Sequence, residues 1–288
     1  MAKISVIGIC GNSVFMQVDH FHERGETLCA DSVYEEIGGK GINQTIAARR
    51  MGAEVSFLCA VGNDENGRKC IKEIEKNRVN THLKIKENKA TPLAFILTDK
   101  FGENRVTVHK SAQLCPEDVI SFESEIASSD ILLLQNEVPE EVNELAASLA
   151  KRHGVKVILN PAPMRQISDT LRENVDIVTP NEQEAKGIDG ANFESCITTL
   201  GSRGCLINGR TAIPSISVKA VDTTGAGDTF NGVLAVALAE GMDMERAVKY
   251  AVCAAGISVT RSYVINAIPK REEIERELIS YEKSKGGK

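Results

Sequence analysis

AVDTTGAGDTFNG, residues 220–232, carries more information about the architecture of this chain than any other segment. Gly225 and Gly227 stand where a polar stretch gives way to an apolar run of helical character, Phe230–Ala239. That order places bare backbone N–H groups at the N-terminus of a helix. Unpaired donors and the helix dipole both favour an anion there. The segment therefore predicts a helix start that binds negative charge.

A carboxylate, Asp228, lies inside the same turn. A carboxylate beside an anion site is electrostatically unfavourable unless it is there to take a proton. We interpret Asp228 as a general base for a hydroxyl, while the amides of Gly225, Ala226 and Gly227 hold the charge on a transferring phosphoryl group. The alternative is an ordinary glycine-rich helix start with Asp228 as its cap.

The same run resembles the C-terminal signature of the ribokinase-like (phosphofructokinase-B, PfkB) carbohydrate kinases. GGKGINQ, residues 38–44, is similar to their N-terminal signature. Three shorter motifs of the family follow in the family's order: Asn160–Pro163, Thr179–Glu184 and Thr199–Gly204. The resemblance covers nearly the whole chain and is strongest to the ribokinase branch. It implies one ribokinase-like domain over residues 1–288, a three-layer α/β sandwich.

The composition sets wide bounds on the class of protein. Hydrophobic residues make up 42% of the chain and charged residues 26%, and the formal net charge is −6. This balance is that of an ordinary globular domain, and the absence of a basic stripe speaks against nucleic acid as a partner. No apolar run approaches the roughly 20 residues of a membrane span, so no membrane partner is expected. The eight scattered cysteines predict buried free thiols, and we expect a cytoplasmic protein.

Apolar strands alternate with helical segments through most of the chain, which predicts a parallel sheet covered on both faces. The expected strands are 3–9, 55–61, 130–135, 155–160 and 175–179, and the expected helices are 41–51, 66–77, 139–152, 165–172, 244–258 and 270–281. Residues 187–194 are expected to be a connection without a helix or strand. Residues 283–288 are expected to be a disordered tail.

Two stretches within residues 12–36 and 90–110 alternate polar and apolar residues, and the second contains a turn at Asp99–Asn104. They predict a small antiparallel sheet that stands off the main domain. The resemblance implies the same feature, a β-lid over the sugar that joins two copies into a homodimer.

Candidate acceptor-binding residues come from two places in the chain. By resemblance Gly38, Gly39, Lys40 and Asn43 contact the hydroxyls of a sugar, and Glu137, beyond the strand 131–135, faces the same ligand. Asn12 and Ser13 follow the first strand, and one or the other could accept a hydrogen bond from a sugar hydroxyl. From the residues alone, Lys40 at a helix start or Glu137 in a loop would also suit a solvated surface.

The resemblance also implies a nucleotide site and two cation sites. Asn181, Thr199, Gly201, Gly204 and Gly227 are expected at the nucleotide, and Glu184 is expected to hold Mg²⁺ through water. Asn181 would also suit the cap of a helix. Asp222 and Thr224 resemble the start of a loop that holds K⁺ in ribokinases.

Three departures from the family pattern bear on these expectations. The stretch 8–13 lacks the aspartate that fixes two sugar hydroxyls in ribokinases, a loss of about 1.5–3 kcal/mol per charged hydrogen bond. In the second half of the cation loop, Tyr263 stands near the family's glycine and Ala267 at its serine. The connection after Glu184 is short. The resemblance to ribokinases therefore does not fix the identity of the substrate or the dependence on K⁺.

We expect an ATP-dependent, Mg²⁺-requiring kinase for a hydroxymethyl oxygen of a small sugar, ribose-like first. A nucleoside kinase, or a kinase of another sugar or sugar acid, is the alternative within the family. A non-catalytic sugar-binding regulator is a more distant one. A dinucleotide-dependent oxidoreductase is disfavoured because Gly8 and Gly11 are not part of a full Gly-x-Gly-x-x-Gly motif.

Overall fold

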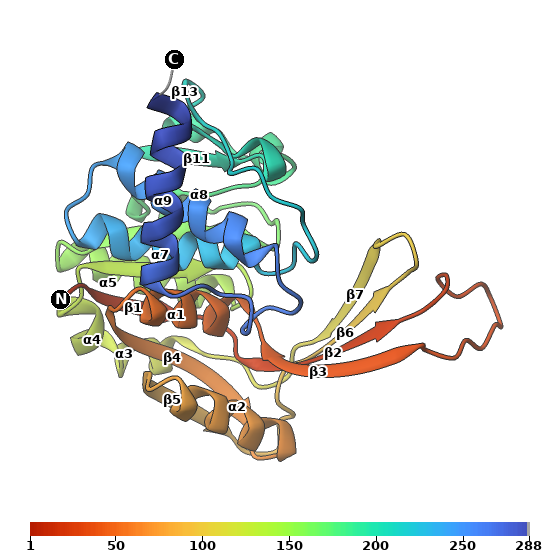
Figure 1. The fold of residues 1–288 in the computed structure, drawn as a ribbon. Coiled ribbons are helices and arrows are strands. Elements are labelled where there is room, and N and C mark those ends of the chain that lie inside the picture. The colour runs from red at the N-terminus through yellow and green to blue at the C-terminus, as the bar shows by residue number, and fades with distance from the viewer. Residues whose placement is uncertain (287–288) are drawn as a thin grey trace.

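A nine-stranded sheet forms the centre of the molecule in the computed structural model, which describes residues 1–286 (Figure 1). From one edge to the other its strands are β13 (Thr211–Ile213), β12 (Cys205–Ile207), β11 (Ser195–Thr199), β10 (Ile177–Val178), β9 (Lys156–Asn160), β8 (Ile131–Gln135), β1 (Lys3–Ile7), β4 (Glu54–Gly62) and β5 (Asn80–Lys86). The seven strands from β11 to β5 pair in parallel. The predicted parallel sheet is confirmed, whereas the antiparallel pair β12 and β13 at the edge was not predicted.

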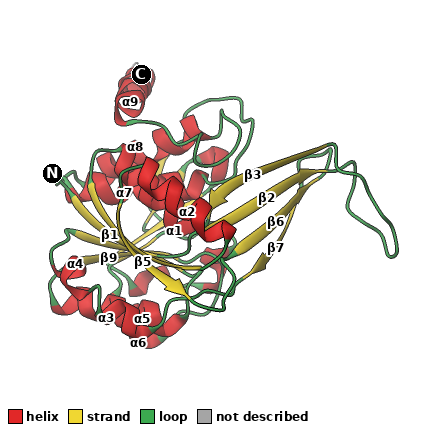
Figure 2. Cartoon of the chain, turned by 90° about the horizontal axis from the view of Figure 1, so that it is seen from below, coloured by secondary structure: helices red, strands yellow, loops and turns green. Residues whose placement is uncertain are grey.

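Helices cover both faces of this sheet, as the view from below shows (Figure 2). One face carries α1 (Lys40–Arg50), α2 (Glu65–Lys76), α7 (Ala226–Ala239), α8 (Met244–Ser258) and α9 (Arg271–Gly286). The other carries α3 (Pro116–Ile120), α4 (Glu123–Ala127), α5 (Glu140–Arg152) and α6 (Asp169–Asn174). Apolar side chains fill both interfaces, including Ile46, Phe57 and Val233 above the sheet and Phe122 and Leu134 below it. The predicted three-layer α/β fold is confirmed.

Several predicted boundaries were wrong for local reasons. Helix α6 begins four residues later than predicted because Ser168 caps it, accepting the N–H of Leu171 at 3.2 Å. Helix α9 continues to Gly286, so the disorder predicted from 283 does not begin there. Its exposed residues are mostly Glu, Lys and Arg, which favour a helix. Residues 287–288 of that predicted tail lie outside the described residues. Segment 187–194 contains only short 3₁₀ turns, η1 (Glu184–Gly187) and η2 (Gly190–Asn192).

A second sheet projects away from the main body (Figure 1). Its strands, in order, are β3 (Ser32–Gly38), β2 (Gly11–Gln17), β6 (Leu93–Thr98) and β7 (Asn104–His109). The pairs β2–β3 and β6–β7 are antiparallel, and β2 joins β6 in parallel. Asp99 closes the predicted turn by accepting the backbone N–H groups of Phe101 and Glu103. We call this sheet the lid.

All eight cysteines are free thiols, as predicted. Burial was predicted for them as a group, and this is wrong for Cys29, which is exposed, and for Cys115 and Cys196, which are half-buried. Cys29 lies in the long connection between β2 and β3, where no core is available to cover it. Within residues 1–286, none of the helices combines the length and apolar character needed to cross a bilayer.

Candidate active site

The N-termini of α1 and α7 begin next to the foot of the lid, and each follows a glycine with positive φ. Gly39 precedes α1 with φ 108°, and Gly225 precedes α7 with φ 75°. A Cβ atom on Gly39 would lie 2.4 Å from Ile9 Cγ2, and one on Gly225 would lie 2.3 Å from Val264 Cγ1. Both the backbone angle and the space therefore require glycine, because other residues rarely adopt such φ values.

A cavity of about 250 Å³ lies between these helix starts and the lid. It brings together all the residues predicted to bind the acceptor: Asn12, Ser13, Gly38, Gly39, Lys40, Asn43, Glu137 and Asp228. They come from β2, from β3 and α1, from the segment after β8, and from α7. We call this space the acceptor cavity.

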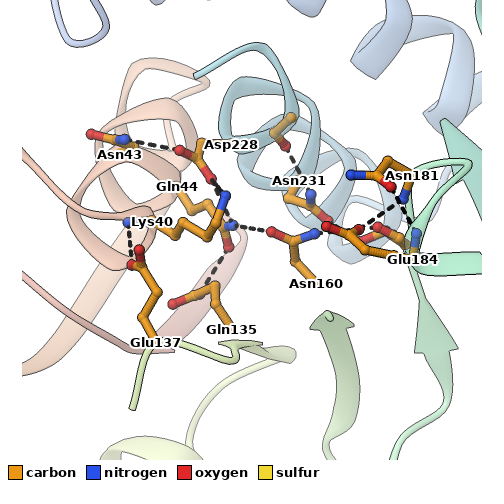
Figure 3. A network of polar contacts seen from close by, with 12 residues as sticks. Lys40, Asn43, Gln44, Gln135, Glu137, Asn160, Asn181, Glu184, Asp228 and Asn231 are labelled. Atoms are coloured by element: carbon orange, nitrogen blue, oxygen red, sulfur yellow. Dashed lines mark hydrogen bonds and ion pairs between the residues drawn. The ribbon is translucent and has the colours of Figure 1, made fainter. Parts of the chain in front are cut away.

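Asp228 is almost fully buried at the floor of the acceptor cavity, with 5% of its surface exposed. Asn43 Nδ2 donates to its Oδ2 at 2.9 Å, and Gln44 Nε2 donates to its Oδ1 at 3.2 Å (Figure 3). Lys40 Nζ lies 3.8 Å from the same Oδ1. The carboxylate is therefore held by two amides and one cation, which is the compensation that a buried charge needs.

Lys40 and Glu137 form a second polar pair at the cavity. The backbone N–H of Lys40 donates to Glu137 Oε2 at 2.6 Å. Burial raises the pKa of the Glu137 carboxyl above its usual value, partly opposed by the nearby Lys40 ammonium. The Asp228 carboxylate is the main cause that raises the pKa of Lys40, so the lysine remains a cation between two acids.

A second cavity, of about 280 Å³, lies on the other side of the turn that starts α7. It contains four of the five residues predicted at the nucleotide: Thr199, Gly201, Gly204 and Gly227. Its remaining wall is largely apolar and was not predicted; that wall includes Ile216, Val218, Phe230, Val252 and Val259. We call this space the donor cavity.

The turn at residues 223–228 is the wall shared by the two cavities. Thr224, Gly225 and Asp228 line the acceptor cavity, whereas Thr223, Ala226 and Gly227 line the donor cavity. The start of α7 thus presents a carboxylate to one space and backbone to the other.

The three amides predicted to form an anion site are not equivalent. The N–H of Ala226 donates to the Thr223 carbonyl at 3.3 Å and is used within the turn. Gly227 and Asp228 stand in the first turn of α7, where amides have no acceptor inside their own helix. Gly227 also faces open space, since nothing lies within 4 Å of an added Cβ. The backbone at Gly227 is therefore the part of this turn best placed for an anion.

Asn181 and Glu184 follow β10, and the side chain of each accepts the backbone N–H of the other. Glu184 Oε2 accepts the backbone N–H of Asn181 at 2.8 Å, and Asn181 Oδ1 accepts the N–H groups of Gln183 and Glu184 at 2.9 Å each (Figure 3). Neither Asn181 nor Glu184 is among the residues that line the two cavities. Asn181 thus makes the kind of contact expected of a cap, and its role at the nucleotide stays a prediction.

Both carboxylate oxygens of Asp222 already hold backbone donors. Oδ1 accepts the N–H of Thr224 at 2.9 Å, and Oδ2 accepts the N–H of Tyr263 at 3.2 Å. Tyr263 adopts a φ of 72°, which is uncommon for a residue other than glycine. Its ring stacks on Tyr34 of the lid. Asp222 thus joins the two halves of the predicted cation loop through direct hydrogen bonds.

Other residues of the site were missed by sequence reasoning. Glu36 lines the acceptor cavity and accepts the backbone N–H groups of Val264 and Ile265 at 2.8 and 2.9 Å. The predicted acceptor residue Asn12 directs its amide nitrogen elsewhere, toward Glu35 and Asn66. The lid covers the cavity with apolar side chains that the alternation in β2, β6 and β7 would have indicated: Phe15, Ile96, Val106 and Val108.

Two cavities that share the turn at residues 223–228, with a buried carboxylate at the floor of one, are the arrangement expected of an enzyme that transfers a group between two substrates. A family model described as pfkB family carbohydrate kinase matches residues 1–271. Ribokinase from Haemophilus influenzae is 35% identical, over 94% of this chain and 96% of that protein. The structure of ribokinase from Thermotoga maritima superimposes with a TM-score of 0.87 at 35% identity, covering 97% of this chain and 100% of that one.

The structure of Arabidopsis thaliana ribokinase complexed with ribose and ATP has a TM-score of 0.84 at 26% identity. That match covers 96% of this chain and 99% of the plant chain. The chain belongs to the pfkB family of carbohydrate kinases. It is a phosphotransferase of the ribokinase type that acts on a sugar hydroxyl.

Proposed function

We propose that this chain transfers the γ-phosphoryl group of ATP to a hydroxymethyl oxygen of a ribose-like sugar. The observation that carries the proposal is the shared wall at residues 223–228. A sugar in the acceptor cavity meets the Asp228 carboxylate, while a nucleotide in the donor cavity meets the backbone of Gly227 on the other side of the same turn. Relatives named ribokinase, and one of their structures with ribose and ATP, support this choice of substrates.

Asp228 takes the proton of the sugar hydroxyl as its oxygen attacks the γ-phosphorus, and the bond from phosphorus to ADP breaks. Asn43 orients the Asp228 carboxylate and the sugar hydroxyl relative to each other. Its Nδ2 already donates to Asp228, and its buried Oδ1 has no partner within the described residues, so it is free to accept from a sugar hydroxyl. Glu137 offers a second acceptor at the same cavity.

Negative charge on the transferring group is met by two groups of the chain. The first-turn backbone of α7 at Gly227 supplies N–H donors and the positive end of the helix dipole. Lys40 lies between Asp228 and Glu137 and supplies a positive charge. Closure of the lid over the acceptor cavity would exclude water, which otherwise competes as the acceptor.

The chain fits an ATP-bound Mg²⁺ better than a metal held by protein alone. Among residues 1–286, no three His, Cys, Asp or Glu groups are clustered closely enough to hold a metal ion. Mg²⁺ keeps several waters and is commonly held by substrate phosphates with one or two carboxylates. Glu184, buried and tied to Asn181 through one oxygen, is the carboxylate we assign to its water shell. Such an ion would neutralise phosphate charge.

The proposed monovalent site at Asp222 and Thr224 does not fit K⁺ well. Each carboxylate oxygen of Asp222 already accepts one backbone N–H, which leaves fewer lone pairs for a cation. Ala267 supplies no hydroxyl. No step of the reaction is therefore assigned to K⁺.

We also propose that two copies associate through the lid. The outer strands β3 and β7 each have one unpaired edge, and all six residues of β7 are exposed. Exposed strand edges favour pairing with another chain. The use of ATP and the free state of all eight cysteines support a cytoplasmic location.

A nucleoside is the second candidate acceptor, favoured by one observation. The lid side of the acceptor cavity is apolar, at Phe15, Ile96, Val106 and Val108, and could pack against a base.

The experiment that tests the proposal is ADP release with Mg-ATP across a panel of pentoses, deoxypentoses, hexoses and nucleosides. ³¹P NMR of the product locates the new phosphate ester. We expect ribose to give the highest kcat/KM. The ³¹P signal of its product should show coupling to the protons of a methylene group. A nucleoside that exceeds every free sugar would favour the second candidate. No turnover in folded protein that binds ATP would contradict both.

A further inference from the structure

A chain of buried side-chain amides leads from the middle of the sheet to Asp228. Gln44, on the second turn of α1, has no exposed surface. Its Nε2 donates to Asp228 Oδ1 and to Asn160 Oδ1, each at 3.2 Å, and its Oε1 accepts Gln135 Nε2 at 2.8 Å (Figure 3). Gln135 ends β8 and Asn160 ends β9, so two strands and two helices meet at this one amide.

The network fixes which way each amide faces. Asn160 Nδ2 donates to the backbone carbonyl of Thr179 at 3.2 Å, and a carbonyl can only accept. The Oδ1 of Asn160 must therefore face Gln44, which must in turn present its NH₂ group. The same NH₂ group then faces Asp228. If the Gln44 amide were reversed, its oxygen would face two other oxygens, and its nitrogen would face the donor of Gln135.

Gln44 does not line the acceptor cavity or the donor cavity. Its contact with the reaction runs only through the Asp228 carboxylate. Hydrogen bonds donated to a carboxylate stabilise its charged form and fix its plane. Asn43 holds Oδ2 from the cavity side, and Gln44 holds Oδ1 from the core side.

We infer that Gln44 is a positioning residue that holds the Asp228 carboxylate in the orientation in which it accepts the proton of the sugar hydroxyl. The inference rests on the proposed role of Asp228 as the base. Gln135 and Asn160 act one step further back, because they set the orientation of the Gln44 amide. The β8 and β9 ends of the sheet thus contribute to catalysis without touching a ligand.

Two charged groups influence this carboxylate directly, and a third acts on one of them. Lys40 on α1 lies 3.8 Å from Asp228 Oδ1, and Glu137, beyond β8, acts on it as a like charge. Glu184 acts on Lys40 from η1. None of them changes in a Gln44 variant, so a shift in the pH profile of such a variant reports on the lost amide.

The test compares Gln44→Met with the wild type in kcat, acceptor KM and the pH profile of kcat. Loss of a donor to a charged group is expected to lower kcat by roughly 10–100-fold. Acceptor KM should change little, because Gln44 does not touch the ligand. The acid limb of the profile should move to higher pH, because the ionised carboxylate loses a donor. In Gln44→Glu a second carboxyl faces the first, and the acid limb should move further still.

Asn143→Leu is the matched control. Asn143 is also a fully buried amide, but its hydrogen bond goes to the backbone carbonyl of Gln135 and not to Asp228. The Asn143→Leu variant should have a lower melting temperature than the wild type and the same pH profile of kcat. The inference is overturned if Gln44→Met keeps wild-type kcat and pH profile, or if Asn143→Leu shifts the profile equally.

Should the Gln44 variants fail to fold, Gln135→Met gives the same test, because it releases the Gln44 amide and leaves Gln44 in place. An unchanged pH profile in that variant would overturn the inference. Asp228→Asn separates this inference from the proposed function. If Asp228→Asn remains fully active, the proposed role of Asp228 fails. If it is inactive while the Gln44 variants behave as wild type, only the inference fails.

Discussion

The ring of Tyr34 stacks on the ring of Tyr263, with centroids 3.6 Å apart and planes 19° apart. Tyr34 belongs to lid strand β3, and Tyr263 lies in the loop between α8 and α9. Two residues after Tyr34, Glu36 accepts the backbone N–H of Val264, the residue that packs on Gly225. The lid is therefore tied to the loop that supports the start of α7.

Tyr34→Ala should weaken this tie. Aromatic pairs contribute about 0.5–1.5 kcal/mol beyond their buried area, so we expect a modest loss in the free energy of unfolding. We expect a larger relative effect on acceptor KM, which should rise because β3 forms one wall of the acceptor cavity. Steady-state kinetics and thermal unfolding measure the two effects.

Phe101→Ala is the control for that variant, since Phe101 is an exposed aromatic residue at the tip of the lid. It should leave acceptor KM unchanged. Equal acceptor KM values in Tyr34→Ala and the wild type would show that the stack does not hold the lid in place for binding.

Gly227→Ala should separate stability from nucleotide use. An added Cβ meets nothing within 4 Å, and alanine is favoured over glycine in a helix by up to about 1 kcal/mol. The melting temperature should therefore stay constant or rise. The new methyl group projects where Gly227 lines the donor cavity, so kcat/KM for ATP should fall. A stable variant with unchanged kcat/KM for ATP would contradict the placement of phosphate at this turn.

Glu137 gives a prediction for the pH dependence of sugar binding. Burial raises the pKa of its carboxyl above 4.5, and protonation removes acceptor capacity for sugar hydroxyls. Acceptor KM should therefore rise as pH falls through the raised pKa. In Glu137→Gln, KM should be higher near neutral pH and should lose this dependence. An acceptor KM that responds to pH identically in both proteins would remove Glu137 from the sugar site.

The raised pKa of Glu137 also affects the stability of the folded protein. Low pH, which should weaken sugar binding, should favour folding. The folded state keeps the Glu137 proton to higher pH than the unfolded state, so the unfolding free energy of the wild type should decrease as pH rises from about 4.5 through the raised pKa. Glu137→Gln should lack this component. Urea unfolding of both proteins across that range measures the difference, which isolates Glu137 from Glu36, whose pKa burial also raises.

Turnover should depend little on K⁺. The Asp222 carboxylate already accepts two backbone N–H groups, and these hold together the loop segments that a cation would otherwise bridge. Initial rates in K⁺ and in a bulky organic cation, at constant ionic strength, should be similar. Activation of several-fold by K⁺ over the organic cation would show that Asp222 exchanges its amides for the ion.

The sequence predicted the elements whose signals are local. The central strands appear as apolar runs, and Glu137 could be placed near a ligand because it follows β8, at the end of a parallel strand where ligands bind. The acceptor residues after β3 were predicted from the family resemblance. The shared wall at residues 223–228 was partly foreseen, since glycines beside a carboxylate at a helix start have few uses. These predictions needed only periodicity, turn chemistry and motif order.

What the sequence could not predict depends on contacts between distant segments. The stack of Tyr34 on Tyr263 joins residues more than 200 positions apart, and Tyr263 had been recognised only as a departure from a glycine. Gln44 lies inside a predicted helix, and nothing local indicates that its amide reaches Asp228. The short edge strand β12 has too few residues to show a period. Tertiary packing decided all three.

The central claim is that Asp228 accepts the proton of the sugar hydroxyl, and the most direct measurement is kcat for Asp228→Asn beside the affinities for sugar and ATP. The amide keeps the size of the carboxylate and cannot act as a base. We predict a loss in kcat of about 10²–10⁴-fold with sugar and ATP still bound. A variant that binds both substrates and turns over at the wild-type rate would contradict the account.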